Sequence, residues 1–313
     1  MRLSYLALLL PTILATTVQA ADADSATCNT VRMSDPGWSD INATNALAGT
    51  LLAGLGYKQE VKSLSVPVGF QGLKTKQLDV FLGNWLPAQA PVLSKFTSDG
   101  SVETLATNLA SAKFTLAVPD YVAAAGVKSF KDLAKFSDKF DHKIYGIAPG
   151  SPANQNLQKM LKQKDFGLNS WSLVESSETG MLTQVDRAVK NKQWVVFLGW
   201  EPHVMNAHYK LTYLSDGDAY FGPNYGSATV NTLTRKNFAA ECPNVAKLFS
   251  NLQFTVDVEN NFIKRVSDDK QDVATAAKDE LKQHPELLTK WLKDVKTVDG
   301  KDGLAAVKTS LGL

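Results

Sequence analysis

The sequence has few of the residues from which metal sites and hydrolytic centres are built. It contains two cysteines, Cys28 and Cys242, and four histidines, which are His142, His203, His208 and His284. His203 and His208 are five positions apart, a poor spacing for one face of a helix, and no cysteine or carboxylate completes a zinc set with them. The nucleophile pattern GxSxG and the metalloprotease pattern HExxH are absent. We therefore expect no catalytic residue, no metal and no cofactor.

The chain also lacks an excess of charge and, beyond its N-terminus, any long hydrophobic run. Its 33 lysine and arginine residues nearly balance its 31 aspartate and glutamate residues, and the lysines are spread along predicted helices. This pattern indicates neither a nucleic-acid partner nor a membrane-binding surface. Every later apolar run is far shorter than the ~20 residues that a membrane helix needs.

The first 20 residues have the pattern of a secretory signal peptide. Arg2 precedes an apolar run over residues 6–14, and the small residues Val18 and Ala20 stand at positions −3 and −1 of a predicted cut before Ala21. The run is too short to span a membrane. Because no cysteine follows the cut directly, we expect an exported protein without a lipid anchor, in the periplasm of a bacterium.

The two cysteines are predicted to form a disulfide, since an exported chain matures in an oxidising compartment. Neither Cys28 nor Cys242 has the neighbours that a catalytic or metal-binding role would need. Closing so long a loop stabilises a fold by up to ~5 kcal/mol in the chain-entropy model. The pairing also implies that the first and last parts of the chain belong to one lobe.

The mature chain of about 290 residues exceeds the usual size of a single core, so two lobes are expected. Strands and helices alternate twice in a β-α-β-α-β order, which predicts an α/β fold with a doubly wound sheet in each lobe. In the first half we expect strands at 30–34, 61–69 and 80–85, helices at 41–56 and 70–79, and a connection at 101–109. The predicted division is residues 21–110 plus 207–313 for lobe 1 and residues 111–206 for lobe 2. The helical segments after Cys242, including Trp291, are predicted to pack in lobe 1.

Three tryptophans follow predicted strands. The runs VFLGNW and VFLGW each stop at a glycine and end on Trp85 and Trp200, and Trp38 lies in the loop after the first strand. Open α/β sheets bind ligands at the carboxyl ends of their strands. Phe114 and Tyr121 flank a predicted crossing between the lobes. We expect a shared cleft to which each lobe offers an indole; unrelated packing tryptophans are the alternative.

Indole faces attract cations, including those without hydrogen-bond donors. Four rings in a closed cleft could supply ~8 kcal/mol before the costs of association, enough for micromolar binding. Stacking of sugar rings is the alternative use, but these loops offer only part of the polar surroundings that it needs. Asp40 is a candidate N-cap of the helix that follows and also a candidate counter-charge for a cation, and both roles can hold at once.

With these residues assembled, the chain resembles the periplasmic substrate-binding proteins of quaternary-ammonium ABC transporters, in particular the choline-binding branch of the glycine-betaine-type family. The matching stretches run through essentially the whole mature chain and include SDPGWSDI, LSVPVG, DVFLGNW, KIYGIAPG, VESSETGML, VVFLGWEPHVMN, FGPNYGSATV and CPNVAKL. The resemblance implies a two-lobed periplasmic binding protein of type II, with two crossovers, a hinge and the ligand in the interlobe cleft. It implies a monomer that serves a permease and an ATPase.

The resemblance also implies an aromatic box around a trimethylammonium group, formed here by Trp38, Trp85, Phe114 and Trp200, with Asp40 near the cation. Choline binders usually have tyrosine at the position of Phe114 and asparagine at that of Ser151.

Phenylalanine keeps the aromatic face but loses the hydroxyl, and serine has a shorter reach, so Asn154 or a water could meet the ligand's hydroxyl. Choline is the first prediction. Carnitine and glycine betaine stay open, although Asp40 would repel their carboxylate and no arginine stands in the cleft-facing loops. A choline-ester hydrolase and a sugar receptor are the remaining alternatives.

Overall fold

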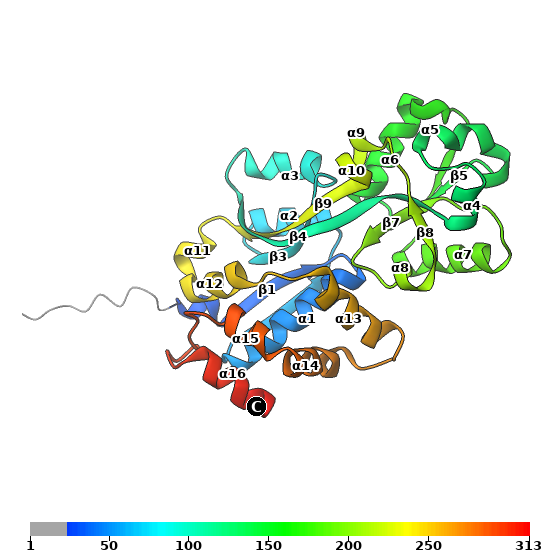
Figure 1. Ribbon diagram of the computed structural model, residues 1–313. Coiled ribbons are helices and arrows are strands. Elements are labelled where there is room, and N and C mark those ends of the chain that lie inside the picture. The colour runs from blue at the N-terminus through cyan, green and yellow to red at the C-terminus, as the bar shows by residue number, and fades with distance from the viewer. Residues whose placement is uncertain (1–23) are drawn as a thin grey trace, which may run out of the picture.

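The computed structural model describes residues 24–313, so the predicted signal peptide lies outside the described residues. The described chain forms two α/β lobes, connected by the long strands β4 and β9 (Figure 1). The strands are β1 (Thr30–Asp35), β2 (Lys58–Ser63), β3 (Val80–Leu86), β4 (Val102–Pro119), β5 (Lys143–Tyr145), β6 (Ser172–Val174), β7 (Phe197–Glu201), β8 (Leu211–Tyr213) and β9 (Ser227–Arg235).

Helices cover both lobes, and no helix among residues 24–313 has the length and apolarity to cross a membrane. The helices are α1 (Ser39–Gly54), α2 (Val66–Lys74), α3 (Ala90–Thr97), α4 (Asp120–Ala124), α5 (Phe130–Leu133), α6 (Pro152–Gln163), α7 (Glu178–Lys190), α8 (Met205–His208), α9 (Asp218–Phe221), α10 (Pro223–Gly226), α11 (Phe238–Glu241), α12 (Pro243–Asn251), α13 (Val256–Ser267), α14 (Val273–Gln283), α15 (Pro285–Trp291) and α16 (Gly303–Leu311). Three short 3-10 helices are η1 (Ala26–Asn29), η2 (Ala134–Phe140) and η3 (Asp165–Gly167).

The sheet confirms the α/β class. Its nine strands follow the order β2-β1-β3-β9-β4-β7-β5-β6, with β8 paired to β4. In the first lobe β1 is parallel to β2 and β3, and in the second lobe β5 is parallel to β6 and β7. Strands β4 and β9 run antiparallel to each other and to their neighbours β7 and β3. Each lobe therefore contributes three parallel strands, and two antiparallel strands connect the lobes.

Two predicted elements were wrong. The connection expected at 101–109 is the first half of β4, whose backbone pairs with β9 from Val102 onward. The strand expected at 61–69 ends at Ser63, because Pro67 lies in the first turn of α2, where a missing N–H costs nothing.

The chain leaves the second lobe later than the predicted residue 207. Strand β8 pairs with the end of β4 at Ala117–Pro119, and the side chains of Leu214 and Phe221 are buried in the core of the second lobe. The apolar residues of this segment are therefore buried in the second lobe, and the chain returns to the first lobe along β9. Beyond it, helices α11 to α16 pack against the first lobe, most of them on the side of α1, and Trp291 is completely buried there, as predicted (Figure 1).

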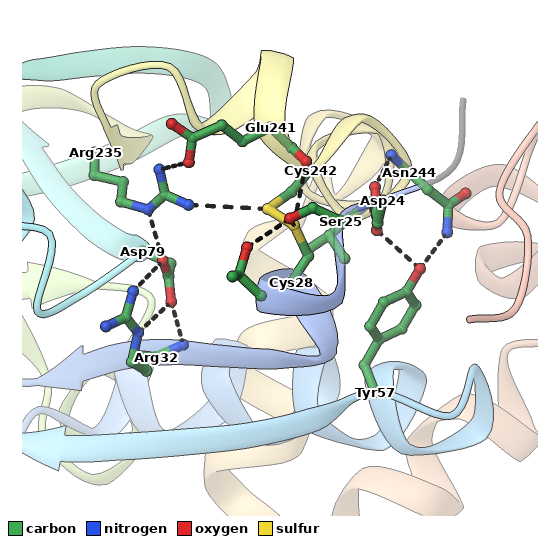
Figure 2. The surroundings of a disulfide bond; sticks show 12 residues. Asp24, Ser25, Cys28, Arg32, Tyr57, Asp79, Arg235, Glu241, Cys242 and Asn244 are labelled. Atoms are coloured by element: carbon green, nitrogen blue, oxygen red, sulfur yellow. Dashed lines mark hydrogen bonds and ion pairs between the residues drawn. A yellow bond between two sulfur atoms is a disulfide. The ribbon is translucent and has the colours of Figure 1, made fainter. Parts of the chain in front are cut away.

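The predicted disulfide between Cys28 and Cys242 is confirmed, with Cα atoms 5.7 Å apart. It joins η1 to the residue that precedes α12, and both cysteines are buried in the core of the first lobe (Figure 2). The start and the C-terminal part of the described chain are therefore held in the same lobe.

A buried carboxylate lies beside this disulfide (Figure 2). Asp79 accepts hydrogen bonds from Nε of Arg32 at 2.8 Å and from Nε of Arg235 at 2.7 Å. Burial alone would raise the pKa of Asp79, but the hydrogen bonds from the two guanidinium groups outweigh burial and hold this pKa below its usual value. The group connects β1, β9 and the start of β3 at the base of the first lobe.

Candidate functional site

A cavity lies between the lobes. The first lobe lines it from α1, β3 and the segment after β3, and the second lobe lines it from β4, the start of α6 and β7. The lining residues are Trp38, Asp40, Trp85, Ala88, Gln89, Phe114, Ile147, Pro152, Ala153 and Trp200. Asp40 is the one ionisable residue among them, so the cavity combines aromatic faces with a single carboxyl group.

Three of the aromatic rings form a continuous group. Phe114 of β4 lies directly opposite Trp200 of β7 in the antiparallel register, with ring centroids 6.4 Å apart. The centroid of Phe114 is also 6.0 Å from that of Trp85. Trp38 completes the lining from the N-cap position of α1. The structure therefore brings together all four residues of the predicted aromatic box.

The sequence suggested that the glycines before Trp85 and Trp200 end their strands, but they do not. Gly83 and Gly199 lie within β3 and β7. A Cβ added at Gly83 would collide with the side chain of Ile41 in α1, and one at Gly199 would lie 2.8 Å from the Cβ of Ala117. These glycines allow close packing beneath the site.

Asp40 lies in the first turn of α1, and the N-cap of this helix is Trp38, so the N-cap interpretation of Asp40 was wrong. Its Oδ2 accepts a hydrogen bond from Nε1 of Trp85 at 3.0 Å, whereas its buried Oδ1 has no partner among the described residues. Burial, followed by the charge of Glu178, raises the pKa of Asp40 to about 7. This carboxyl group is therefore poised to ionise when a cation enters the cavity, and Oδ1 can accept a ligand hydroxyl.

Ser151 and Asn154 do not line the cavity. Ser151 is the N-cap of α6, and its Oγ accepts the backbone N–H of Asn154 at 3.2 Å. The side-chain amide of Asn154 is completely buried and bonds both the N–H and the C=O of Ile147. Ser151 and Asn154 therefore hold the loop between β5 and α6 in place. Ile147 of this loop and Pro152 and Ala153 at the start of α6 form part of the cavity wall.

Sequence reasoning missed Ala88, Gln89, Ile147, Pro152 and Ala153. One feature of the sequence could have indicated these five residues, since each lies within a few positions of a predicted site residue. Tyr121, in contrast, lies outside the lining, and its hydroxyl donates to the carbonyl of Gln193 at 2.6 Å. Within residues 24–313, no group of three or more His, Cys, Asp or Glu side chains could hold a metal ion.

Known proteins share this architecture. A solved ABC-transporter choline binding protein in complex with choline is 51% identical, with a TM-score of 0.91, over 92% of this chain and 100% of that one. An ABC-transporter choline binding protein in an unliganded semi-closed conformation is 52% identical, with a TM-score of 0.84 and the same coverage of both chains. The glycine betaine/carnitine transport binding protein GbuC of Listeria monocytogenes serotype 1/2a (strain 10403S) is 26% identical over 211 residues, which are 67% of this chain and 65% of that protein.

The family model described as the substrate binding domain of ABC-type glycine betaine transport system matches residues 29–299. This range includes both lobes and every residue that lines the cavity. Its members are binding components of transporters and not enzymes. The chain therefore belongs to the family of substrate-binding domains of ABC-type glycine betaine transport systems.

Proposed function

We propose that this protein binds choline between its lobes and delivers it to the permease and ATPase subunits of an ABC importer. The observation that carries the proposal is a cavity lined by four aromatic residues, with Asp40 as its one ionisable group. A trimethylammonium group has no N–H donor, so it is recognised by aromatic faces and by a nearby negative charge. The solved relative with bound choline supports this assignment.

The charge of the cavity favours choline over carnitine and glycine betaine. Both alternatives carry a carboxylate, which the ionised Asp40 would repel, and the lining includes no arginine or lysine to receive it. Choline carries a hydroxyl, which can donate to the free Oδ1 of Asp40. Because Ser151 does not line the cavity and Phe114 has no hydroxyl, Asp40 is the residue that accepts the hydroxyl of the ligand.

In this account Trp38, Asp40, Trp85, Phe114 and Trp200 contact the ligand, and Ser151 and Asn154 hold the cavity wall. Lining residues come from both lobes, so the ligand stabilises the closed form, in which the box is complete. From the signal-peptide pattern of residues 1–20 we infer that this step takes place in the periplasm, where the closed, monomeric complex meets the permease.

Calorimetric titration with choline, carnitine, glycine betaine and a simple sugar tests the proposal. The protein is first unfolded and refolded, which removes ligand carried over from the cell. We expect choline to bind most tightly, glycine betaine weakly and the sugar not at all. Tighter binding of carnitine or glycine betaine would reassign the ligand, and binding of the sugar alone would remove the cation box from the account.

A further inference from the structure

Glu178 of the second lobe contacts Ser39 of the first lobe. The backbone N–H of Ser39 donates to Oε2 of Glu178 at 3.1 Å, and the hydroxyl of Ser39 donates to Oε1. Glu178 is the first residue of α7, and Ser39 is the first residue of α1. Ser39 also stands between Trp38 and Asp40, two residues of the cavity. The contact therefore links the second lobe to the segment that carries part of the site.

Glu178 supplies a cap that α1 lacks. The first N–H groups of a helix have no partner within the helix, and α1 follows Trp38, whose side chain makes no capping hydrogen bond. A carboxylate at this end also interacts favourably with the helix dipole. Helix α7 does not need Glu178 for its own cap, because Oγ of Ser177 accepts the N–H of Gly180 at 3.0 Å. Glu178 is thus free to cap a helix of the opposite lobe.

His203 fixes the position of Glu178 from within the second lobe. Nδ1 of His203 accepts the backbone N–H of Met205 at 2.9 Å, so Nε2 carries the proton and donates to Oε1 of Glu178 at 3.0 Å. The imidazole is 1% exposed, and its centroid lies 4.9 Å from that of Trp200. One continuous chain of contacts therefore runs from the box residue Trp200 through His203 and Glu178 to Ser39.

We propose that Glu178 is a positioning residue that fastens the two lobes and slows the release of the ligand. When the lobes close, its carboxylate meets Ser39, completes the cap of α1 and fixes Trp38 and Asp40 in the cavity. When the lobes separate, both hydrogen bonds to Ser39 are lost at once. The identity of the ligand used below rests on the proposed function, whereas the contact between the lobes does not.

The variants Ser39→Ala and Glu178→Gln test the proposal. The first removes the hydroxyl donor and leaves every charge in place; the second keeps the shape of the side chain but replaces one acceptor by a donor. Stopped-flow tryptophan fluorescence measures association and dissociation of choline. We expect the dissociation rate to rise about tenfold in both variants, with association changed less than about threefold, because hydrogen bonds to charged groups are strong and contacts made after encounter act on release.

Asp132→Asn is the matched control. Asp132 also caps a helix, since its Oδ2 accepts the N–H of Ser129 at 3.0 Å, but both residues belong to the second lobe. This variant is expected to lower the melting temperature and to leave the dissociation rate of choline unchanged. Unchanged dissociation in both Ser39→Ala and Glu178→Gln would overturn the proposal. An effect of Glu178→Gln alone would also overturn it, because Glu178 would then act on the cation through its charge.

A second readout needs no ligand. Spin labels on cysteines that replace the exposed residues Lys62 and Lys159 report the distance between the lobes. We expect a closed population in the ligand-free protein that is smaller in Glu178→Gln and Ser39→Ala. If the unmodified protein binds no choline, the proposed function fails. The role of Glu178 is overturned by a different result, which is an equal closed population in all three proteins.

Discussion

The indole Nε1 of Trp85 donates a hydrogen bond to Oδ2 of Asp40, at 3.0 Å, so the aromatic box and its carboxyl group form one unit. The bond joins β3 to the first turn of α1. It leaves Oδ1 of Asp40 without a partner among residues 24–313. The side chain of Trp85 thus offers an aromatic surface to the ligand and also orients the carboxylate of Asp40 beside it.

Replacing Trp85 by phenylalanine keeps an aromatic face but leaves both oxygens of a buried carboxyl group without a partner. We expect choline affinity to fall by about 1–3 kcal/mol, measured by calorimetry. Trp171→Phe is the matched control, because Nε1 of Trp171 donates to Oγ of Ser137 at 3.0 Å away from the cavity. Equal losses in the two variants would mean that the Trp85–Asp40 bond has no special role in binding.

Choline affinity is expected to rise with pH. Burial and the charge of Glu178 raise the pKa of Asp40 to about 7, and a bound cation favours the ionised carboxylate. Below pH 7 the ligand must displace a proton, so the dissociation constant should fall by up to about tenfold for each pH unit between 5 and 7 and level off above pH 7. Titrations at pH 5, 6, 7 and 8 measure this, and a flat profile in the unmodified protein would contradict it.

Asp40→Asn tests the same group without a change of pH. The variant should bind choline more weakly, lose most of the pH dependence between 5 and 7 and weaken glycine betaine binding less than choline binding. It should also be more stable than the unmodified protein near neutral pH. The raised pKa means that the folded protein holds a proton that the unfolded chain releases between about pH 4 and 7, so Asp40 lowers the free energy of unfolding as pH rises through this window. Equal losses for both ligands would argue against a hydrogen bond from the choline hydroxyl to Asp40 and against repulsion between Asp40 and the carboxylate of glycine betaine.

Trp200→Ala removes one face of the box and the partner of Phe114 and His203. We expect a loss of at least ~1–2 kcal/mol in choline binding, which is the range for a desolvated cation–π contact. Trp171→Ala serves as the control for general destabilisation, since this residue does not line the cavity. Unchanged affinity in Trp200→Ala, measured by calorimetry, would be incompatible with the box.

Removal of the disulfide should affect stability and not binding. Neither Cys28 nor Cys242 lines the cavity, and both are buried in the core of the first lobe. The double variant Cys28→Ser and Cys242→Ser is expected to lose ~2–5 kcal/mol in the free energy of unfolding, measured with urea. Its affinity for choline should stay within about twofold of the original value at a temperature where both proteins are folded; a large loss would show that this bond shapes the site.

The aromatic part of the site could be predicted from the sequence because it depends on local patterns. Trp85 and Trp200 lie near the carboxyl ends of the buried strands β3 and β7, and Trp38 follows β1, so each ring lies at a strand end that faces the cavity. The pairing of Cys28 with Cys242 was equally accessible, since only two cysteines are present. The family resemblance added Phe114, whose place opposite Trp200 depends on the register of β4 with β7.

The rest depends on contacts that no local pattern encodes. The first half of β4 has too many polar residues to stand out as a strand, and its long pairing partner β9 lies more than a hundred residues away in sequence. The amide of Asn154 was a candidate ligand contact, yet it bonds the backbone of Ile147. No local pattern of the sequence singles out Glu178, because its contact with Ser39 exists only where the two lobes meet.

The proposed function requires that aromatic faces and Asp40 recognise the positive charge of the ligand. The most direct measurement compares choline with 3,3-dimethylbutan-1-ol, which has the same shape and hydroxyl but a neutral carbon in place of the nitrogen. Calorimetry at pH 8 should show choline binding at least about a hundredfold more tightly, because cation–π attraction and the carboxylate both act on the charge. Similar affinities for the two compounds would show that the cavity recognises shape and apolar surface, and would rule out recognition of the positive charge.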